Sequence, residues 1–201
     1  MNIGVLGGTF DPIHNGHLLV AAEVRKRLNL VKVIFVPAGQ PYFKQASPVS
    51  LAKHRLEMVK LAISDKPYFE LSTLEIERPG PSYTVETLAG LKDLLQADEI
   101  FFILGWGSLT ELPQWKEPSR IIKLCYLVAV PRPGYKLPDL KALESKIPGL
   151  SGRLILMDKP RIDVSTSDIR GRVSQGLSIS QLVPQAVERY IKQHELYTVK
   201  T

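Results

Sequence analysis

Short apolar runs alternate along the chain with longer segments in which apolar residues recur every three or four positions. The short runs are typical of buried strands and cover residues 1–6, 31–36, 100–104, 126–130 and 154–157. The longer segments predict helices over residues 17–28, 50–63, 84–95, 167–175 and 184–194, the second capped by Ser50. The alternation predicts an α/β fold with one doubly wound domain, residues 1–201, a parallel central sheet and a C-terminal helical part from about residue 165.

Composition and charge restrict the classes of partner. The 201 residues carry a formal net charge of +6, with 44% hydrophobic and 23% charged residues, which is typical of a folded globular protein with anionic partners. The chain has no run of five or more Lys and Arg, so small phosphorylated substrates are favoured over nucleic acid. No apolar run reaches the roughly 18 residues of a membrane span, and we expect a cytoplasmic protein with no membrane partner.

Cysteine and histidine usage argues against a protein-bound metal. Cys125 is the only cysteine, which excludes an internal disulfide and a cysteine-based zinc site. Its apolar neighbours predict a buried packing residue rather than a nucleophile. His14 and His17 lack the companion ligands of a zinc site, so no protein metal site is predicted.

The segment after the first predicted strand carries the strongest chemical signal. It reads Gly7-Gly8-Thr9-Phe10-Asp11-Pro12-Ile13-His14-Asn15-Gly16-His17. Gly7 and Gly8 let the backbone approach a phosphate without obstruction by side chains. His17 lies at the start of the next predicted helix, where the positive dipole end favours an anion. His14 is three residues earlier, with Gly16 between the two, so a tight loop can direct both rings at one ligand.

This string resembles the signature of the nucleotidyltransferase superfamily whose hallmark is Thr/His-x-Gly-His. Neither Gly-x-x-x-x-Gly-Lys-Ser/Thr nor Gly-x-Gly-x-x-Gly occurs at this turn. The resemblance implies a Rossmann-like nucleotidyltransferase fold and a loop that wraps the triphosphate of a nucleotide. It further implies that His17 donates to the α-phosphate and that His14 supports the same group or the bridging oxygen.

Segments further along resemble the bacterial nicotinate mononucleotide adenylyltransferases, and with the first loop they span nearly the whole chain. Residues 77–88 read Glu-Arg-Pro-Gly-Pro-Ser-Tyr-Thr-Val-Glu-Thr-Leu, similar to the family's Arg-x-Gly-x-Ser-Tyr-Thr helix start. Backbone amides there, of Thr84 and Val85 in this chain, are implied to read the nicotinate carboxylate. Residues 104–115 resemble the segment that supplies an aromatic platform for the pyridine ring. Trp115 is the candidate for that role, with core packing as the alternative, and Trp106 is more ambiguous.

Two further segments supply candidate cations. Residues 164–170 read Val-Ser-Thr-Ser-Asp-Ile-Arg, similar to the family's Ile-Ser-x-Thr-x-Ile-Arg, which starts a helix at the triphosphate. The hydroxyls of Ser165 and Ser167 suit phosphate or a helix cap, and the guanidinium of Arg170 can bind two phosphate oxygens. Lys44 lies in the loop that occupies the place of the family's Pro-Pro-His-Lys/Arg element, with a solvated charge as its alternative. His54 and Arg55 lie in the next helix, where either can face solvent.

The resemblance assigns the site residues as follows. The catalytic set is His14, His17, Lys44 and Arg170. The ATP-binding set is Gly7, Gly8, Thr9, Phe10, His14, His17, Gly105, Ser165, Ser167 and Arg170. The mononucleotide-binding set is Lys44, Tyr83, Thr84, Val85 and Trp115.

The chain departs from the family pattern at two places. Residues 41–44 read Pro-Tyr-Phe-Lys, so an aromatic ring replaces the family's histidine. Gly107 stands where the family has the aspartate of Gly-x-Asp, which holds the ribose hydroxyls of adenosine. Losing such a carboxylate costs about 1.5 to 3 kcal/mol per charged hydrogen bond, or about tenfold or more in ATP affinity.

The resemblance implies adenylyl transfer from ATP to nicotinate mononucleotide, giving deamido-NAD and pyrophosphate in NAD biosynthesis. Mg²⁺ is expected as a cofactor bound through ATP. Three alternatives remain: a nicotinamide mononucleotide adenylyltransferase, a phosphopantetheine adenylyltransferase, and a nucleotide-binding protein with reduced turnover, which Gly107 keeps open. The second should lack the Tyr83 segment and Trp115. The sequence does not determine the oligomeric state, and a homo-oligomer is one alternative.

Overall fold

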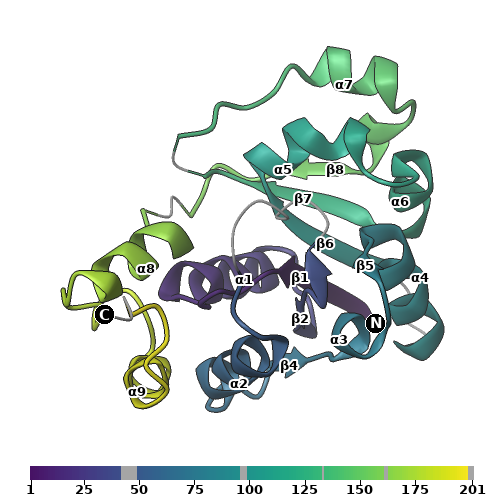
Figure 1. The fold of residues 1–201 in the computed structure, drawn as a ribbon. Coiled ribbons are helices and arrows are strands. Elements are labelled where there is room, and N and C mark those ends of the chain that lie inside the picture. Colours follow the sequence, from purple (N-terminus) through teal and green to yellow (C-terminus); the bar gives the residue numbers. More distant parts are fainter. Residues whose placement is uncertain (42–48, 96–98, 133, 161–162, 199–201) are drawn as a thin grey trace.

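A parallel sheet of six strands forms the centre of the molecule. The computed structural model describes residues 1–41, 49–95, 99–132, 134–160 and 163–198. The sheet order β4-β2-β1-β6-β7-β8 joins Phe69–Leu71, Lys32–Pro37, Asn2–Gly8, Glu99–Gly105, Tyr126–Val130 and Leu154–Leu156 (Figure 1). Every pair of neighbours in this sheet is parallel. In chain order the strands run 3-2-1-4-5-6, which confirms the predicted doubly wound α/β fold.

Helices cover both faces of this sheet (Figure 1). One apolar layer packs the sheet against α1, α2, α8 and α9, which span Asn15–Arg27, Ala52–Ile63, Thr166–Ser174 and Gln185–Gln193. The opposite layer packs it against α3, α4, α5, α6 and α7, which span Leu74–Glu77, Thr84–Leu95, Trp106–Glu111, Pro118–Leu124 and Leu140–Lys146. Period two in the strands divides the apolar residues between the layers: Val5 faces the second, whereas Leu6 faces the first.

Smaller elements complete the connections. β3, Gln40–Pro41, and β5, Pro81–Ser82, form a separate parallel pair beside the carboxyl end of β2. Two short 3-10 turns, η2 at Leu112–Gln114 and η3 at Leu150–Gly152, follow α5 and α7. Within the described residues, no helix combines the length and the apolar character that crossing a membrane requires.

The five predicted strands and the five predicted helices are confirmed, with ends shifted by a few residues. Helices α3, α5, α6 and α7 and strand β4 were not predicted, because three to seven residues are too few to display a clear period. The predicted cap of α2 is wrong, because the N-cap residue is Leu51. The backbone N–H of Ser50 donates to Asp11, and its carbonyl oxygen accepts from Arg55. Cys125 is fully buried, as predicted, and burial raises the pKa of its thiol to about 12.

Candidate active site

A cavity of about 740 Å³ opens at the carboxyl ends of β1, β6 and β7. The chain leaves β1 toward β2 on one side and the later strands lie on the other, so this is the point where the strand order reverses. The wall comes from the loop after β1, the start of α5, the segment after β7 and the start of α8. Pockets of about 300–1,000 Å³ hold small ligands, so the cavity is large enough for a nucleotide.

The loop between β1 and α1 forms one wall and includes Gly7, Gly8, Thr9 and Phe10. A Cβ atom at Gly8 would lie 3.1 Å from the ring of Phe10, so a side chain there would push against that ring. Phe10 is buried and has a φ of +50°, a left-handed conformation that costs a bulky residue about 1–3 kcal/mol. Its ring meets the edge of His17, with centroids 5.0 Å apart. Packing thus holds the loop in the shape that presents His17.

His14 and His17 lie on the same wall, as the sequence predicted. His14 is the N-cap residue of α1, and the two rings stack with centroids 3.6 Å apart and an interplanar angle of 20°. The backbone N–H of His14 donates to Nδ1 of His17 at 3.2 Å. An Nδ1 that accepts a hydrogen bond carries no proton, so the neutral ring of His17 is protonated at Nε2. Nε2 is therefore the atom of His17 that can donate to a ligand.

His14 is uncharged at neutral pH. Burial lowers the pKa of His14 to about 4, with the positive charge of Arg132 as the second cause. Only 4% of the residue is exposed, and its Nδ1 has no hydrogen-bond partner among the described residues. A buried polar atom without a partner at a cavity wall is a candidate contact for a ligand.

The start of α8 supplies another part of the wall. Ser165 is the N-cap, and its Oγ accepts from the backbone N–H of Asp168 at 3.1 Å. Helix α8 therefore directs its positive dipole end toward the cavity, as α1 does. Two helix N-termini that converge on one space favour a polyanion.

The two arginines of α8 point in different directions. Residues 165, 168 and 172 are three and four apart, so Arg172 shares the cavity face with Ser165 and Asp168. Arg170 and Ser167 do not line the cavity. Arg170 instead donates through Nη1 to the backbone oxygen of Asp11 at 2.8 Å. Asp11 belongs to residues 7–17, the histidine loop. Arg172 is therefore the cation that α8 presents to a ligand.

The residues expected at the pyridine ring are brought to one region. Trp115 lines the cavity, with its ring edge against Phe102 at a centroid distance of 6.2 Å. Tyr83, Thr84 and Val85 lie at the start of α4 and do not line the cavity. Lys116 joins the two segments, because its Nζ lies 4.3 Å from the centre of the Tyr83 ring and bonds Glu86 at 2.6 Å. Thr84 and Val85 begin α4, where N–H groups have no partner within the helix.

After the end of β6, Tyr135 fills the space beside Gly107, the position where the family has an aspartate. Gly105 and Ser108 line the cavity, whereas Gly107 is covered by Tyr135. A Cβ atom at Gly107 would lie 2.6 Å from Cε1 of Tyr135 and 2.7 Å from its Cδ1. The guanidinium of Arg132 lies 5.4 Å from the centre of the same ring. Any side chain at position 107 must therefore displace Tyr135.

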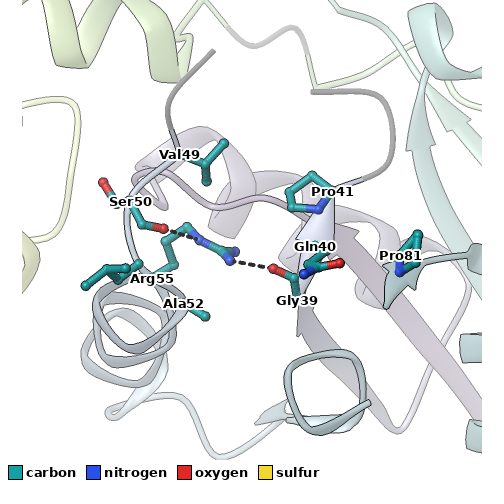
Figure 2. Close-up of a pocket in the computed structure, with 9 residues that line it drawn as sticks. Gly39, Gln40, Pro41, Val49, Ser50, Ala52, Arg55 and Pro81 are labelled. Carbon is teal, nitrogen blue, oxygen red and sulfur yellow. Dashed lines mark hydrogen bonds between the residues drawn. The ribbon is translucent and has the colours of Figure 1, made fainter. Parts of the chain in front are cut away.

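A second pocket of about 380 Å³ lies beside the first turn of α2 and the β3–β5 pair. Figure 2 shows the side chain of Arg55 pointing from α2 toward the carbonyl groups of Ser50 and Gly39. Arg55 is only 1% exposed, so it does not face solvent. Lys44, predicted as a catalytic and mononucleotide-binding residue, lies outside the described residues.

The profile of the cytidylyltransferase-like family matches residues 5–172. A probable nicotinate-nucleotide adenylyltransferase of Dehalococcoides mccartyi strain CBDB1 is 53% identical over 100% of this chain and 98% of the relative. A relative of the same name from Roseiflexus sp. strain RS-1 is 48% identical over 97% of each chain. The chain belongs to the nicotinate-nucleotide adenylyltransferase family.

Solved structures share the fold. The nicotinic acid mononucleotide adenylyltransferase of Plasmodium falciparum, complexed with NaAD, superimposes with a TM-score of 0.79. It is 20% identical in sequence, over 98% of this chain and 97% of that chain. The same enzyme complexed with APC gives a TM-score of 0.77 at 19% identity, over 98% and 96%. The doubly wound architecture is thus shared with nucleotidyltransferases.

The sequence prediction missed two arginines in this member of the adenylyltransferase family. Arg132 and Arg172 both line the cavity. Arg132 directly follows the end of β7, so the rule that ligands lie at the carboxyl ends of strands could have indicated it. Arg172 could have been found by helical spacing from Ser165, which is seven residues earlier and on the same face.

Proposed function

We propose that this protein transfers the adenylyl group of ATP to nicotinate mononucleotide and releases pyrophosphate. The observation that carries the proposal is the stacked histidine pair at a cavity where the N-termini of α1 and α8 converge. Relatives that are about half identical over the full length carry the name of this activity. The cytoplasm is the proposed location.

The donor nucleotide occupies the wall between the histidine loop and α8. The backbone of Gly7 and Gly8 approaches the phosphates, and the N-termini of α1 and α8 offset their negative charge. Arg172 and Arg132 are the cations placed for phosphate oxygens, since both line the cavity. Arg170 supports the loop through Asp11.

The reaction is a direct displacement at the α-phosphorus of ATP. A phosphate oxygen of the mononucleotide forms the new P–O bond, the bond to the bridging oxygen breaks, and pyrophosphate leaves with the electron pair. A phosphate oxygen is already a nucleophile, so no covalent enzyme intermediate is needed and catalysis consists of alignment and charge stabilisation. Nε2–H of His17 donates to the α-phosphate as negative charge builds, and the neutral His14 supports it by stacking.

The acceptor lies toward α4. Trp115 offers its ring to the pyridine, and the first N–H groups of α4, at Thr84 and Val85, are donors suited to the nicotinate carboxylate. A carboxamide presents only one acceptor oxygen and no charge, so the helix N-terminus favours the acid over the amide. Lys44 is proposed to neutralise phosphate on either substrate.

Magnesium enters as part of the ATP substrate. Among the described residues, no group of three or more His, Cys, Asp or Glu side chains gathers in a metal-binding arrangement. Asp163 and Asp168 line the cavity, and carboxylate oxygens suit Mg²⁺ that keeps most of its water and substrate ligands. These two residues would contact the hydrated ion, which supplies charge neutralisation at the triphosphate.

Pyrophosphate release tests the proposal. ATP and Mg²⁺ are mixed with nicotinate mononucleotide, nicotinamide mononucleotide or phosphopantetheine in parallel. We expect release with the first, with the second poorer by about tenfold or more in kcat/KM, and none with the third. Release with phosphopantetheine alone would reassign the acceptor, and nucleotide binding without any release would identify a binding protein.

A further inference from the structure

Asp11 is a buried junction in the histidine loop, three residues before His14. Only 4% of the residue is exposed, and it accepts three hydrogen bonds. Its Oδ1 accepts from the hydroxyl of Tyr197 at 2.7 Å and its Oδ2 from the backbone N–H of Ser50 at 3.1 Å. Its backbone oxygen accepts from Arg170 at 2.8 Å. The donors come from three segments far apart in the chain, so hydrogen bonds to Asp11 connect the loop to all three segments.

Arg55 extends this network on the side of α2. Its guanidinium donates to the carbonyl oxygens of Ser50 at 3.0 Å and Gly39 at 3.1 Å (Figure 2). It also donates to the carbonyl oxygen of Thr9 at 2.9 Å. Ser50 belongs to both sets, because its carbonyl accepts from Arg55 while its N–H donates to Asp11. The loop is therefore held at Thr9 and at Asp11 by groups that are themselves connected.

Tyr197 closes the network from the other end of the chain. Burial, and next the negative charge of Asp11, raise the pKa of the Tyr197 phenol well above its usual range, so the hydroxyl remains a donor at all working pH values. Its φ of +66° is in the left-handed region, which non-glycine residues adopt mainly where surrounding contacts hold them. The segment between α8 and α9 also binds the start of α1. The backbone N–H of Asn15 donates to the carbonyl oxygen of Leu182 at 2.8 Å, and its side-chain amide donates to the carbonyl oxygen of Gln181 at 3.0 Å.

We propose that Tyr197 is a positioning residue for the adenylyl transfer, acting through Asp11 on His14 and His17. The inference rests on the proposed function. Neither Tyr197 nor Asp11 lines the cavity, so neither contacts the substrates in this arrangement. Without the phenol hydroxyl, Oδ1 of Asp11 is left as a buried anionic oxygen without that donor, and the loop must shift to solvate it. A small shift of the loop misplaces Nε2 of His17, while the parts of the cavity wall that come from α5, the segment after β7 and α8 are unchanged.

Tyr197→Phe tests this, because it removes one oxygen atom and keeps the ring. Tyr190→Phe is the matched control: its hydroxyl bonds Nδ1 of His54 at 3.0 Å, between α2 and α9, and not the loop. Tyr197→Phe should lower kcat by about fivefold or more with both KM values within about twofold, whereas Tyr190→Phe should leave kcat unchanged. A fall in melting temperature with unchanged kcat would mean a purely structural role and overturn the proposal. A raised KM at constant kcat would also overturn it.

A second readout separates this proposal from the proposed function. The ring ¹⁵N shifts of His17 in the ligand-free protein report the hydrogen bond at Nδ1. We expect them to move in Tyr197→Phe and not in Tyr190→Phe, and unchanged shifts would refute positioning. If the wild-type protein releases no pyrophosphate, the proposed function fails, and the ring shifts still decide whether Tyr197 positions His17.

Discussion

Lowering the pH should destabilise the folded protein through His14 before that residue is protonated in the folded state. An exposed histidine titrates near 6.5, whereas burial and Arg132 lower the pKa of His14 to about 4. Above pH 6.5 both states are neutral at this site and it contributes nothing. Between pH 6.5 and about 4 the unfolded chain binds a proton that the folded chain does not, so the free energy of unfolding falls as the pH falls.

The magnitude follows from the two pKa values. Each unit of difference corresponds to about 1.4 kcal/mol, so the contribution of His14 falls by about 2 kcal/mol between pH 7.5 and pH 5. The loss levels off near pH 4 at about 3 kcal/mol, because the folded state then binds the proton as well. This is a large part of the stability of an ordinary domain.

Urea unfolding of the wild type and of His14→Asn, at pH 7.5 and at pH 5, measures the effect. Asparagine is polar, does not titrate and is a favourable N-cap residue, so every other titrating group is common to both proteins. The difference in unfolding free energy between the two should change by about 2 kcal/mol in favour of the variant at pH 5. Parallel pH dependences, or a ring titration of His14 by NMR with a midpoint near 6.5, would refute the reasoning.

Three further substitutions test the site and its support. His17→Ala should lower turnover by about 10²-fold or more, with the fold intact by circular dichroism. His54→Ala is the control and should leave turnover unchanged, because its ring contacts Tyr190 and not the cavity. Near-normal turnover of His17→Ala would reject the mechanism. Gly107→Asp combined with Tyr135→Ala should lower the KM for ATP by about tenfold. Gly107→Asp alone should lower it by less, because the ring of Tyr135 must first move. Equal KM values in the wild type and the double variant would show that no ribose contact was restored. Arg55→Met should lower the free energy of unfolding, measured by denaturant titration, by about 3 kcal/mol or more, because three buried carbonyl oxygens lose their donor. A decrease below about 1 kcal/mol would argue against the network.

The local sequence was sufficient to place the residues of the histidine loop. Gly7 through His17 is contiguous, so its glycines, its two histidines and the helix that follows could be placed from spacing alone. The strands could also be predicted from the sequence, because parallel strands buried on both faces are continuous apolar runs. The short helices α5, α6 and α7 were not, because their boundaries depend on packing against the sheet rather than on an internal period.

Contacts between distant segments account for what the sequence could not predict. Arg170 and Arg172 are two residues apart and chemically identical, and only the docking of α8 decides that Arg172 faces the cavity while Arg170 bonds Asp11. The burial of Arg55 depends on carbonyl groups from three separate loops.

The sequence by itself determined the fold class and the position of the histidine loop, because strand and helix periods, glycine positions and histidine spacing are local properties. The tertiary structure decided which cations face the nucleotide, that Tyr135 fills the space at Gly107, and that Tyr197 holds Asp11. These outcomes follow from the packing of elements that lie up to 186 positions apart in the chain, which no local pattern encodes.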